Sequence, residues 1–301
     1  MSLAILAGLG AVAVFWISGA DRVVWAWSLE GQRAAQGGMA GAIRSLRAGD
    51  LAALLPLLGV CFTYGFFHAA GPGHGKLLIG GYGAAREVGA WRLSAVALAS
   101  SLGQGLTAVA LVAAGLWLVG WSRERMTDMA DRLLQPLGFA AIAAIGLWLV
   151  LRGVRGVASR PGPAGHHHAD HRHDGACGSD GGCGHAHAPD PATVAAATGW
   201  RELAALIAAV AVRPCTGALF LLILTAQMGL FAWGVLGTFA MALGTASVTV
   251  VVALGAVGVR RGVLGGLARG GERLARVQAA LQVVVGLGVA GIAGGLALAS
   301  V

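Results

Sequence analysis

Runs of about 20 residues with almost no charged side chain restrict the fold of this chain more than any other feature. A helix of about 20 apolar residues crosses the roughly 30 Å hydrocarbon layer of a membrane. Only 11% of the 301 residues are charged and 57% are hydrophobic, whereas soluble proteins average about 25% charged residues. We therefore expect an all-α polytopic membrane protein. About seven runs are predicted to be transmembrane helices: 1–20, 51–75, 93–120, 133–151, 203–225, 230–259 and 277–301.

The predicted helices divide the chain into four segments. The sequence Ser-Gly-Ala at 18–20 resembles a small-residue cleavage site, but the basic region of a signal peptide is missing, so we expect the first helix to be retained. The segments are an N-terminal anchor helix with an outer segment, a first transmembrane half, a flexible loop and a second transmembrane half: 1–50, 51–151, 152–201 and 202–301.

The six core helices fall into two sets of three, and each set opens with a proline-interrupted helix. This is the pattern of a 3+3 inverted repeat with its site at the repeat interface. The loops after the second, fourth and sixth helices carry 13 Lys and Arg, against 7 after the first, third and fifth. The positive-inside rule then places the first group of loops and the N-terminus in the cytoplasm. Trp25 and Trp27, in the outer segment, fit an interfacial belt.

The formal net charge of +8 raises the question of a nucleic-acid partner. Arginines scattered between apolar spans reflect membrane orientation more often than a nucleic-acid surface. We expect no nucleic-acid partner. Membrane lipid is the expected surrounding, and the sequence leaves a homo-oligomer open.

The stretch GFFHAAGPGHGK, residues 65–76, has the glycines and the lysine of a phosphate-binding loop. A P-loop requires Gly, four residues, Gly-Lys and then Ser or Thr, after a strand and before a helix. Ala70 stands where the first glycine should be, and Leu77 stands where the hydroxyl should be. The two histidines of this stretch therefore need another explanation.

His68 and His74 flank the Gly-Pro-Gly sequence at 71–73, near the end of the second predicted helix. Proline and glycine break the helical hydrogen-bond ladder and allow the chain to bend back, so both imidazoles can face one ion. Non-helical backbone at membrane depth is tolerated only where it is buried in protein or lines a polar cavity. A broken helix with two ligands is therefore typical of a transporter. The alternative is that each imidazole caps a broken helix end by bonding to a free carbonyl group.

The segment between the fourth and fifth predicted helices is rich in Gly, Pro, His and Asp. Because this segment has almost no apolar side chains to bury, we expect it to be disordered without a partner. Neutral imidazole is the commonest protein ligand for ions such as Zn, Ni, Co and Cu, so the loop predicts binding of a divalent transition metal. A solvated linker that binds metal incidentally is the alternative. Seven of the nine histidines lie here: His166, His167, His168, His171, His173, His185 and His187.

A second proline-interrupted helix carries Arg213, Pro214 and Cys215 inside an otherwise apolar run. An intramembrane arginine marks a candidate functional site. Cys215 is either a soft metal ligand or a small buried hydrophobic residue. Polar residues also recur at helical spacing on the third and sixth predicted helices, where they either join helices or contact a substrate. They are Ser100, Ser101 and Gln104, and Gly244, Thr245 and Thr249.

The motifs FHAAGPGHGK, ASSLGQG, RPCTGAL and FAMALGTASVTV, with a His-rich loop at the centre, resemble the NicO-type nickel/cobalt transporters over about residues 51–259. This resemblance implies movement of divalent Ni or Co ions across the bacterial inner membrane, commonly as efflux for homeostasis. It also implies that His68 and His74 belong to the transport path. Some members carry Ser-His-Thr on the third helix where this chain has Ser100, Ser101 and Leu102, so one of their histidines has no counterpart here.

Together with this resemblance, the residue patterns predict an inner-membrane exporter of Ni or Co ions, in which a cytoplasmic His-rich loop gathers the ion. The predicted metal ligands are His68 and His74, with Cys215 as a further candidate, and the loop histidines are accessory. The ion is the substrate, and no tightly bound cofactor is expected. The alternatives are an uptake permease and a metal-sensing subunit of a larger complex. An enzyme is not expected, because neither intramembrane histidine lies in the His-Glu-x-x-His pattern of a metalloprotease.

Overall fold

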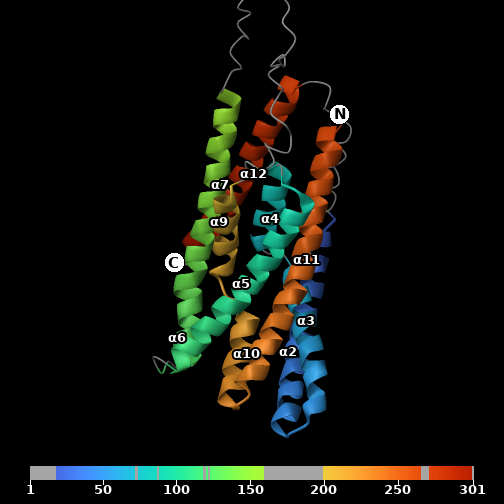
Figure 1. Cartoon of the computed structure of the whole chain (residues 1–301), viewed down its shortest axis with the longest axis vertical. Coiled ribbons are helices and arrows are strands. Elements are labelled where there is room, and N and C mark those ends of the chain that lie inside the picture. Colours follow the sequence, from blue (N-terminus) through green and yellow to red (C-terminus); the bar gives the residue numbers. More distant parts are fainter. Residues whose placement is uncertain are drawn as a thin grey trace, which may run out of the picture.

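A computed structural model describes residues 18–71, 74–86, 88–117, 120, 123–158, 199–265 and 271–299. Every regular element among these residues is helical (Figure 1), which confirms the all-α prediction. Five helices are long and apolar enough to cross a membrane, and there are six such spans if the bent pair of α9 and α10 forms one. These six coincide with the last six predicted spans. The first predicted span, 1–20, lies almost entirely outside the described residues.

The first broken span consists of α3 (Leu54–Ala70) and α4 (His74–Ala85), preceded by a short 3-10 turn, η1 (Leu51–Ala53). The helix stops at Gly71, whose backbone is extended with φ −63° and ψ 167°. A residue before proline avoids the helical region because the proline ring clashes with its backbone, and residue 72 is a proline. The predicted break of this helix is thereby confirmed.

The second broken span consists of α9 (Trp200–Ala211) and α10 (Thr216–Gln227), bent by 59° at the break. Pro214 again interrupts the ladder, and Cys215 has the extended backbone of a residue that precedes a helix, with φ −69° and ψ 129°. Both breaks leave polar backbone inside the bundle, where water or protein groups must satisfy it.

The outer segment of the sequence forms one long amphipathic helix, α2 (Ala20–Arg47), which the sequence predicted only in part. It packs along α3 (Figure 1), with Gly31 against the ring of Phe67 and Gly38 against Val60. The rings of Trp27 and Phe67 meet edge to face at 4.8 Å, and both Trp25 and Trp27 remain exposed. The polar face of α2 thus reaches the end of α3 that carries His68.

The remaining long helices pack as pairs around the two broken spans. Helix α3 packs on α11, α9 packs on α5, α5 and α11 cross each other, and α7 packs on α12. In an inverted repeat, α3 corresponds to α9 and α11 corresponds to α5, so the α3–α11 contact has its counterpart in the α9–α5 contact. The repeat itself remains a prediction. The bounds are α5 (Ala90–Trp117), α6 (Arg123–Met129), the π-helical η2 (Ala130–Leu134), α7 (Gln135–Ala158), α11 (Phe231–Gly265) and α12 (Gly271–Ala299).

Glycines allow α3 and α11 to touch at the backbone. A Cβ atom at Gly65 would overlap the carbonyl oxygen of Met241, and one at Gly244 would overlap the carbonyl oxygen of Phe62. Small residues at helix interfaces permit such close approach in membranes. The contact fixes α11 against the last two turns of α3, next to the break.

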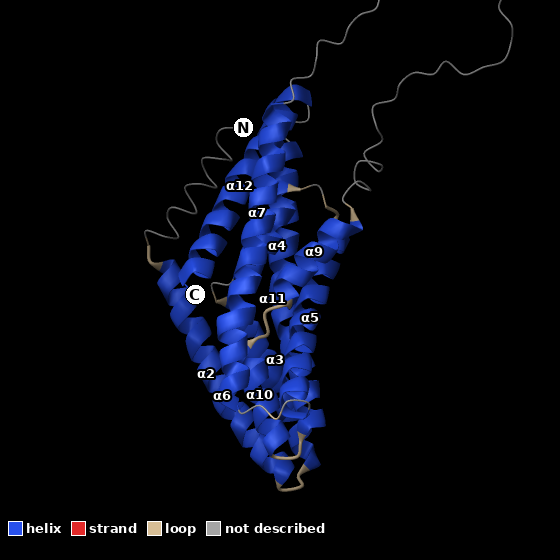
Figure 2. Cartoon of the chain, turned by 90° about the vertical axis from the view of Figure 1, so that its left-hand side faces the viewer, coloured by secondary structure: helices blue, strands red, loops and turns tan. Residues whose placement is uncertain are grey.

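One end of the bundle is joined by a charged cluster centred on Glu202 of α9. Its carboxylate accepts hydrogen bonds from Tyr82 at 2.9 Å, from Arg86 at 3.1 Å and from Arg152 at 3.4 Å. These three donors belong to α4, the turn after it and α7, so the cluster ties both broken spans together. Helix α7 ends and α9 begins at this end of the bundle (Figure 2), with the His-rich loop between them in the sequence. Its seven histidines lie outside the described residues.

Candidate functional site

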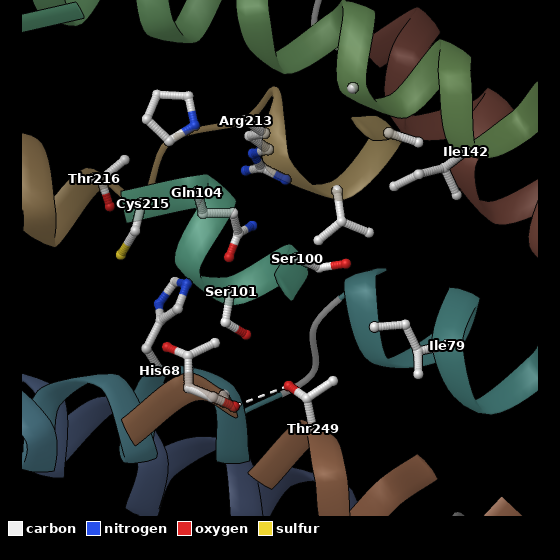
Figure 3. A pocket seen from close by; sticks show the side chains of 16 residues that line it. His68, Ile79, Ser100, Ser101, Gln104, Ile142, Arg213, Cys215, Thr216 and Thr249 are labelled. Atoms are coloured by element: carbon white, nitrogen blue, oxygen red, sulfur yellow. Dashed lines mark hydrogen bonds between the residues drawn. The ribbon is translucent and has the colours of Figure 1, made fainter. Parts of the chain in front are cut away.

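A cavity of about 220 Å³ lies where the two broken spans meet, between α3, α5, α7, α9 and α11 (Figure 3). Since one water molecule occupies about 30 Å³ of the liquid, the space holds an ion together with part of its hydration shell. Polar side chains from both halves of the chain line it: His68, Ser100, Ser101, Gln104, Arg213, Cys215, Thr216, Thr245 and Thr249. All of these except Thr216 were singled out from the sequence, but their convergence on one space is a result of the fold.

His68 lies in the last turn of α3, and its Nδ1 is 3.2 Å from Oε1 of Gln32 on α2. The amide of Gln32 is oriented in turn, because its Nε2 donates to the carbonyl of Ser28 at 3.2 Å. An amide oxygen can only accept, so Nδ1 of His68 carries the proton and Nε2 keeps its lone pair. The imidazole also stacks on the ring of Tyr64, with centroids 6.0 Å apart and an interplanar angle of 9°.

Cys215, at the break of the second span, lies beside His68. Both side chains line the cavity, and Figure 3 shows them pointing toward each other. On its other side, the Sγ atom is 4.0 Å from Sδ of Met241 on α11. The structure therefore brings together two of the three intramembrane residues that the sequence predicted as ligands.

Hydroxyl groups form the other side of the cavity. Ser100 Oγ is buried and has no hydrogen-bond partner among the described residues, so it is free to bind water or an ion. In contrast, Ser101 Oγ donates to the carbonyl of Ala97 at 3.0 Å. Thr245 Oγ1 donates to the carbonyl of Gly65 at 3.2 Å and so joins α11 to α3. Ser100 is thus placed to contact a substrate, and Thr245 holds two helices together.

Arg213 contributes a positive charge to the cavity. Its guanidinium group lies over the ring of Phe139, 4.6 Å from the centroid. Cation–π contact of this kind stabilises a charge that has lost part of its water. A metal cation entering the cavity is repelled by this charge, and thiolate formation at Cys215 would offset the repulsion.

Other predicted ligands are not placed by the structure. His74 is the first residue of α4, but its side chain lies outside the described part, as do the loop histidines. Among the residues that the structure describes, no group of three or more His, Cys, Asp or Glu side chains could hold a metal ion. The described donors at the cavity are therefore one imidazole, one thiol and several neutral oxygens.

Sequence reasoning missed Gln32, Tyr64 and Met241. Tyr64 stacks on the imidazole of His68, and its ring and hydroxyl lie against Gly217 of α10, so it connects α3 and α10 beside the cavity. Nothing in the sequence marks α2 as part of a site, although Gln32 and Gln36 lie on one face of it, four residues apart. That spacing is the one signal that was present.

Comparison with known proteins bears on the substrate. The chain matches the profile of the NicO family, described as a high-affinity nickel-transport protein, over residues 54–176 and 161–301. A Haemophilus influenzae protein described provisionally as a nickel/cobalt efflux system is 28% identical over 198 residues. That match covers 63% of this chain and 61% of the relative, so it spans less than two thirds of the relative's length. No solved structure matches the chain significantly.

Proposed function

The chain belongs to the NicO family of nickel and cobalt transporters, and from that premise we propose that it exports these divalent ions across the bacterial inner membrane. The observation that carries the proposal is the polar cavity at the junction of two broken spans. Discontinuous helices that meet at a polar site are a common construction in transporters, since the unwound backbone can coordinate an ion.

His68 and Cys215 are the proposed ligands at the centre of the path, with His74 as a third. Imidazole suits Ni and Co, and a thiolate supplies the negative charge that offsets both the ion and Arg213. Ser100 and bound water complete the shell. Two or three protein ligands with exchangeable water suit transport, because a site that conducts must release its ion as well as bind it.

The two breaks are the proposed gate. His68 precedes the first break, and Cys215 closes the second, so a change in either bend moves a ligand relative to the other. The 59° bend between α9 and α10 places Cys215 at the cavity in the present arrangement. A change in this bend would separate the thiol from the imidazole and release the ion.

The His-rich loop is the proposed collector of the ion. It joins α7 to α9 at the end of the bundle that holds the Glu202 cluster, and the excess of Lys and Arg in the loops of that side favours the cytoplasm. An ion gathered there and moved through the cavity leaves the cell. The proposed accessory ligands are His166, His167, His168, His171, His173, His185 and His187.

Metal flux in proteoliposomes containing the purified chain tests the proposal. We expect His68→Ala and His74→Ala to lower Ni and Co flux at least about tenfold, since even outer partners of a metal ligand have effects of this size. Thr63→Ala, an exposed position of α3, is the matched control and should transport normally. Unchanged flux in both histidine variants would exclude the cavity as the path.

Further experiments distinguish export from uptake, from transport at the loop and from a metal-sensing role. Deletion of residues 165–189 should lower flux at low ion concentration and leave it near normal at saturation, whereas complete loss would make the loop the transport site. Vesicles of known orientation distinguish export from uptake. A purified chain that binds ions but moves none alone would favour the metal-sensing subunit.

A further inference from the structure

The charged cluster around Glu202 lies between the cavity and the end of the bundle where α7 ends and α9 begins, the loop end. The helices that carry the cluster, α4, α7 and α9, also supply Ile79, Ile142 and Ala209 to the lining of the cavity. Along α9, Glu202 precedes Ala209 by seven residues, which is two helical turns or about 10 Å, so both lie on one face. The same three helices thus run from the cluster to the cavity.

A layer of buried apolar side chains separates the cluster from the cavity. Ile79, Leu149 and Leu206 come from α4, α7 and α9, and each has at most 1% of its surface exposed. All three belong to one apolar cluster. Apolar constrictions close ion paths because a hydrated ion cannot enter a space that excludes water. This layer therefore closes the cavity toward the loop end in the present arrangement.

Long polar side chains, and not close helix packing, join α4 to α9 above this layer. Among the described residues, α9 packs mainly on α5 and α7, whereas α4 packs mainly on α11 and α12. Tyr82 of α4 and Arg86, which follows it, reach across to the carboxylate of Glu202 at 2.9 and 3.1 Å. Bonds of this kind can break without unpacking a pair of helices, unlike the backbone contact between α3 and α11.

The two helices joined in this way are the arms of the two broken spans. Helix α4 follows the break after Gly71, and α9 precedes the break at Pro214. Nine residues separate Glu202 from Ala211, the last residue of α9, so the arm is about 14 Å long and a tilt of about 15° moves its end by about 4 Å. A movement of that size breaks hydrogen bonds of about 3 Å.

The arginines of the cluster hold it closed without satisfying every polar group. The guanidinium groups of Arg86 and Arg152 both lie over the ring of Trp148, 5.8 and 5.4 Å from its centroid. Both also bond to Glu202, so two positive charges share one carboxylate. Nε of Arg86 is buried and has no hydrogen-bond partner among the described residues. Opening would expose this donor to water, which offsets part of the cost of breaking the ion pairs.

We propose that the Glu202 cluster and the apolar layer beneath it form an inner gate of the cavity. The gate opens toward the loop end when α9 tilts about its break and draws Glu202 away from Arg86 and Arg152. This inference rests on the proposed function in taking the cavity as the path of the ion. It adds a barrier at a place that contains none of the proposed metal ligands.

A test that needs no transport is the reaction of Ala209→Cys with a charged, membrane-impermeant thiol reagent in vesicles of known orientation. Serine replaces three native cysteines, Cys177, Cys183 and Cys215, and the buried Cys61 is retained. We expect Arg152→Gln and Glu202→Gln to speed the reaction from the loop end at least about tenfold, the effect of losing one charged hydrogen bond. The rate from the opposite side should not change. Arg201→Gln is the matched control, because this neighbour of Glu202 lies over Trp200 instead.

Equal labelling rates in the parent, Arg152→Gln and Glu202→Gln would overturn the inner gate, and so would an equal increase from both sides, which indicates general loosening. Arg152 is partly exposed, with 43% of its side chain accessible, so its variant should fold and decides the question even if Glu202→Gln does not fold.

A second experiment locks the gate. A cleavable bifunctional thiol reagent joins Arg152→Cys to Glu202→Cys, and we expect Ni flux to stop until the bridge is cleaved. Flux through the bridged chain would also overturn the gate and leave the proposed transport intact. A parent that shows gated labelling but no Ni flux would contradict the proposed transport alone.

Discussion

Gln32 is predicted to set the metal affinity of His68 although it belongs to a helix outside the predicted transmembrane spans. Its Oε1 accepts the Nδ1 proton of His68 at 3.2 Å, and its own amide is held by the carbonyl of Ser28. This chain of bonds keeps the Nε2 lone pair free for the ion. Gln32→Leu removes the acceptor, so the imidazole can turn or adopt the other tautomer, which presents a proton where the metal should bind.

The expected magnitude follows from the geometry. Loss of an outer partner lowers the metal affinity of a ligating histidine by about 10- to 100-fold. The bond joins two neutral groups at the long limit of ordinary hydrogen bonds, so the lower value applies. We expect Ni affinity to fall about tenfold, which corresponds to about 1.4 kcal/mol of binding free energy. Gln32→Glu keeps an acceptor for Nδ1 of His68 but loses the donor to the carbonyl of Ser28, so it should restore the affinity in part.

The assay is Ni titration of the purified chain in detergent, with the number of coordinated imidazoles counted by X-ray absorption. Gln227→Leu, at an exposed end of α10, is the matched control and should bind normally. Leucine has nearly the volume of glutamine but lacks the acceptor oxygen, whereas glutamate keeps that oxygen, so recovery in Gln32→Glu points to the hydrogen bond with His68 rather than to packing. Equal affinity in the parent and Gln32→Leu, with both proteins folded, would refute the tautomer argument.

Three further predictions concern the surroundings of the cavity. Gly65→Ala should lower the unfolding free energy by about 1 to 3 kcal/mol and weaken Ni binding, because the new Cβ atom would overlap a carbonyl oxygen of α11. The control is Gly59→Ala, which has open space around it and should raise the unfolding free energy by about 0.5 to 1 kcal/mol. Glu202→Gln should lower the unfolding free energy by about 1.5 to 3 kcal/mol, since Arg86 is buried and loses its anionic partner; equal thermal unfolding curves would contradict this. Ser100→Ala should leave thermal unfolding unchanged, because the hydroxyl has no partner among the described residues, but lower Ni affinity; normal affinity would exclude the hydroxyl from the shell.

The helix breaks could be predicted from the sequence because they are local. Proline removes a donor and restricts the residue before it, which favours the end of a helix close to Gly71 and Arg213. The apolar runs likewise predicted six of the spans, since length and hydropathy alone decide whether a helix can cross a membrane. Cys215 could be proposed as a ligand for the same local reason: it follows a break.

The partners of the ligands could not be predicted, because they come from distant parts of the chain. Gln32 is 36 residues from His68, on a helix whose polar face is typical of one turned toward water. Met241 lies in an apolar run, where a methionine is indistinguishable from any other core residue. The spacing of Glu202 and Arg86 along the chain, 116 residues, carries no signal of the contact between them. In each case the packing of whole helices determines which side chains meet.

The charge of the cavity explains why a site with so few ligands suits a transporter. Arg213 is a fixed positive charge, and no carboxylate from the described residues lines the space. A divalent ion bound there as proposed would gain one thiolate and one imidazole against the repulsion of a guanidinium group, so its net attraction would be small. A site with two carboxylates in place of Ser100 and Ser101 would hold the ion firmly and would slow its release. Arg213 therefore favours release, and replacing it with a neutral residue should tighten Ni binding while slowing Ni flux.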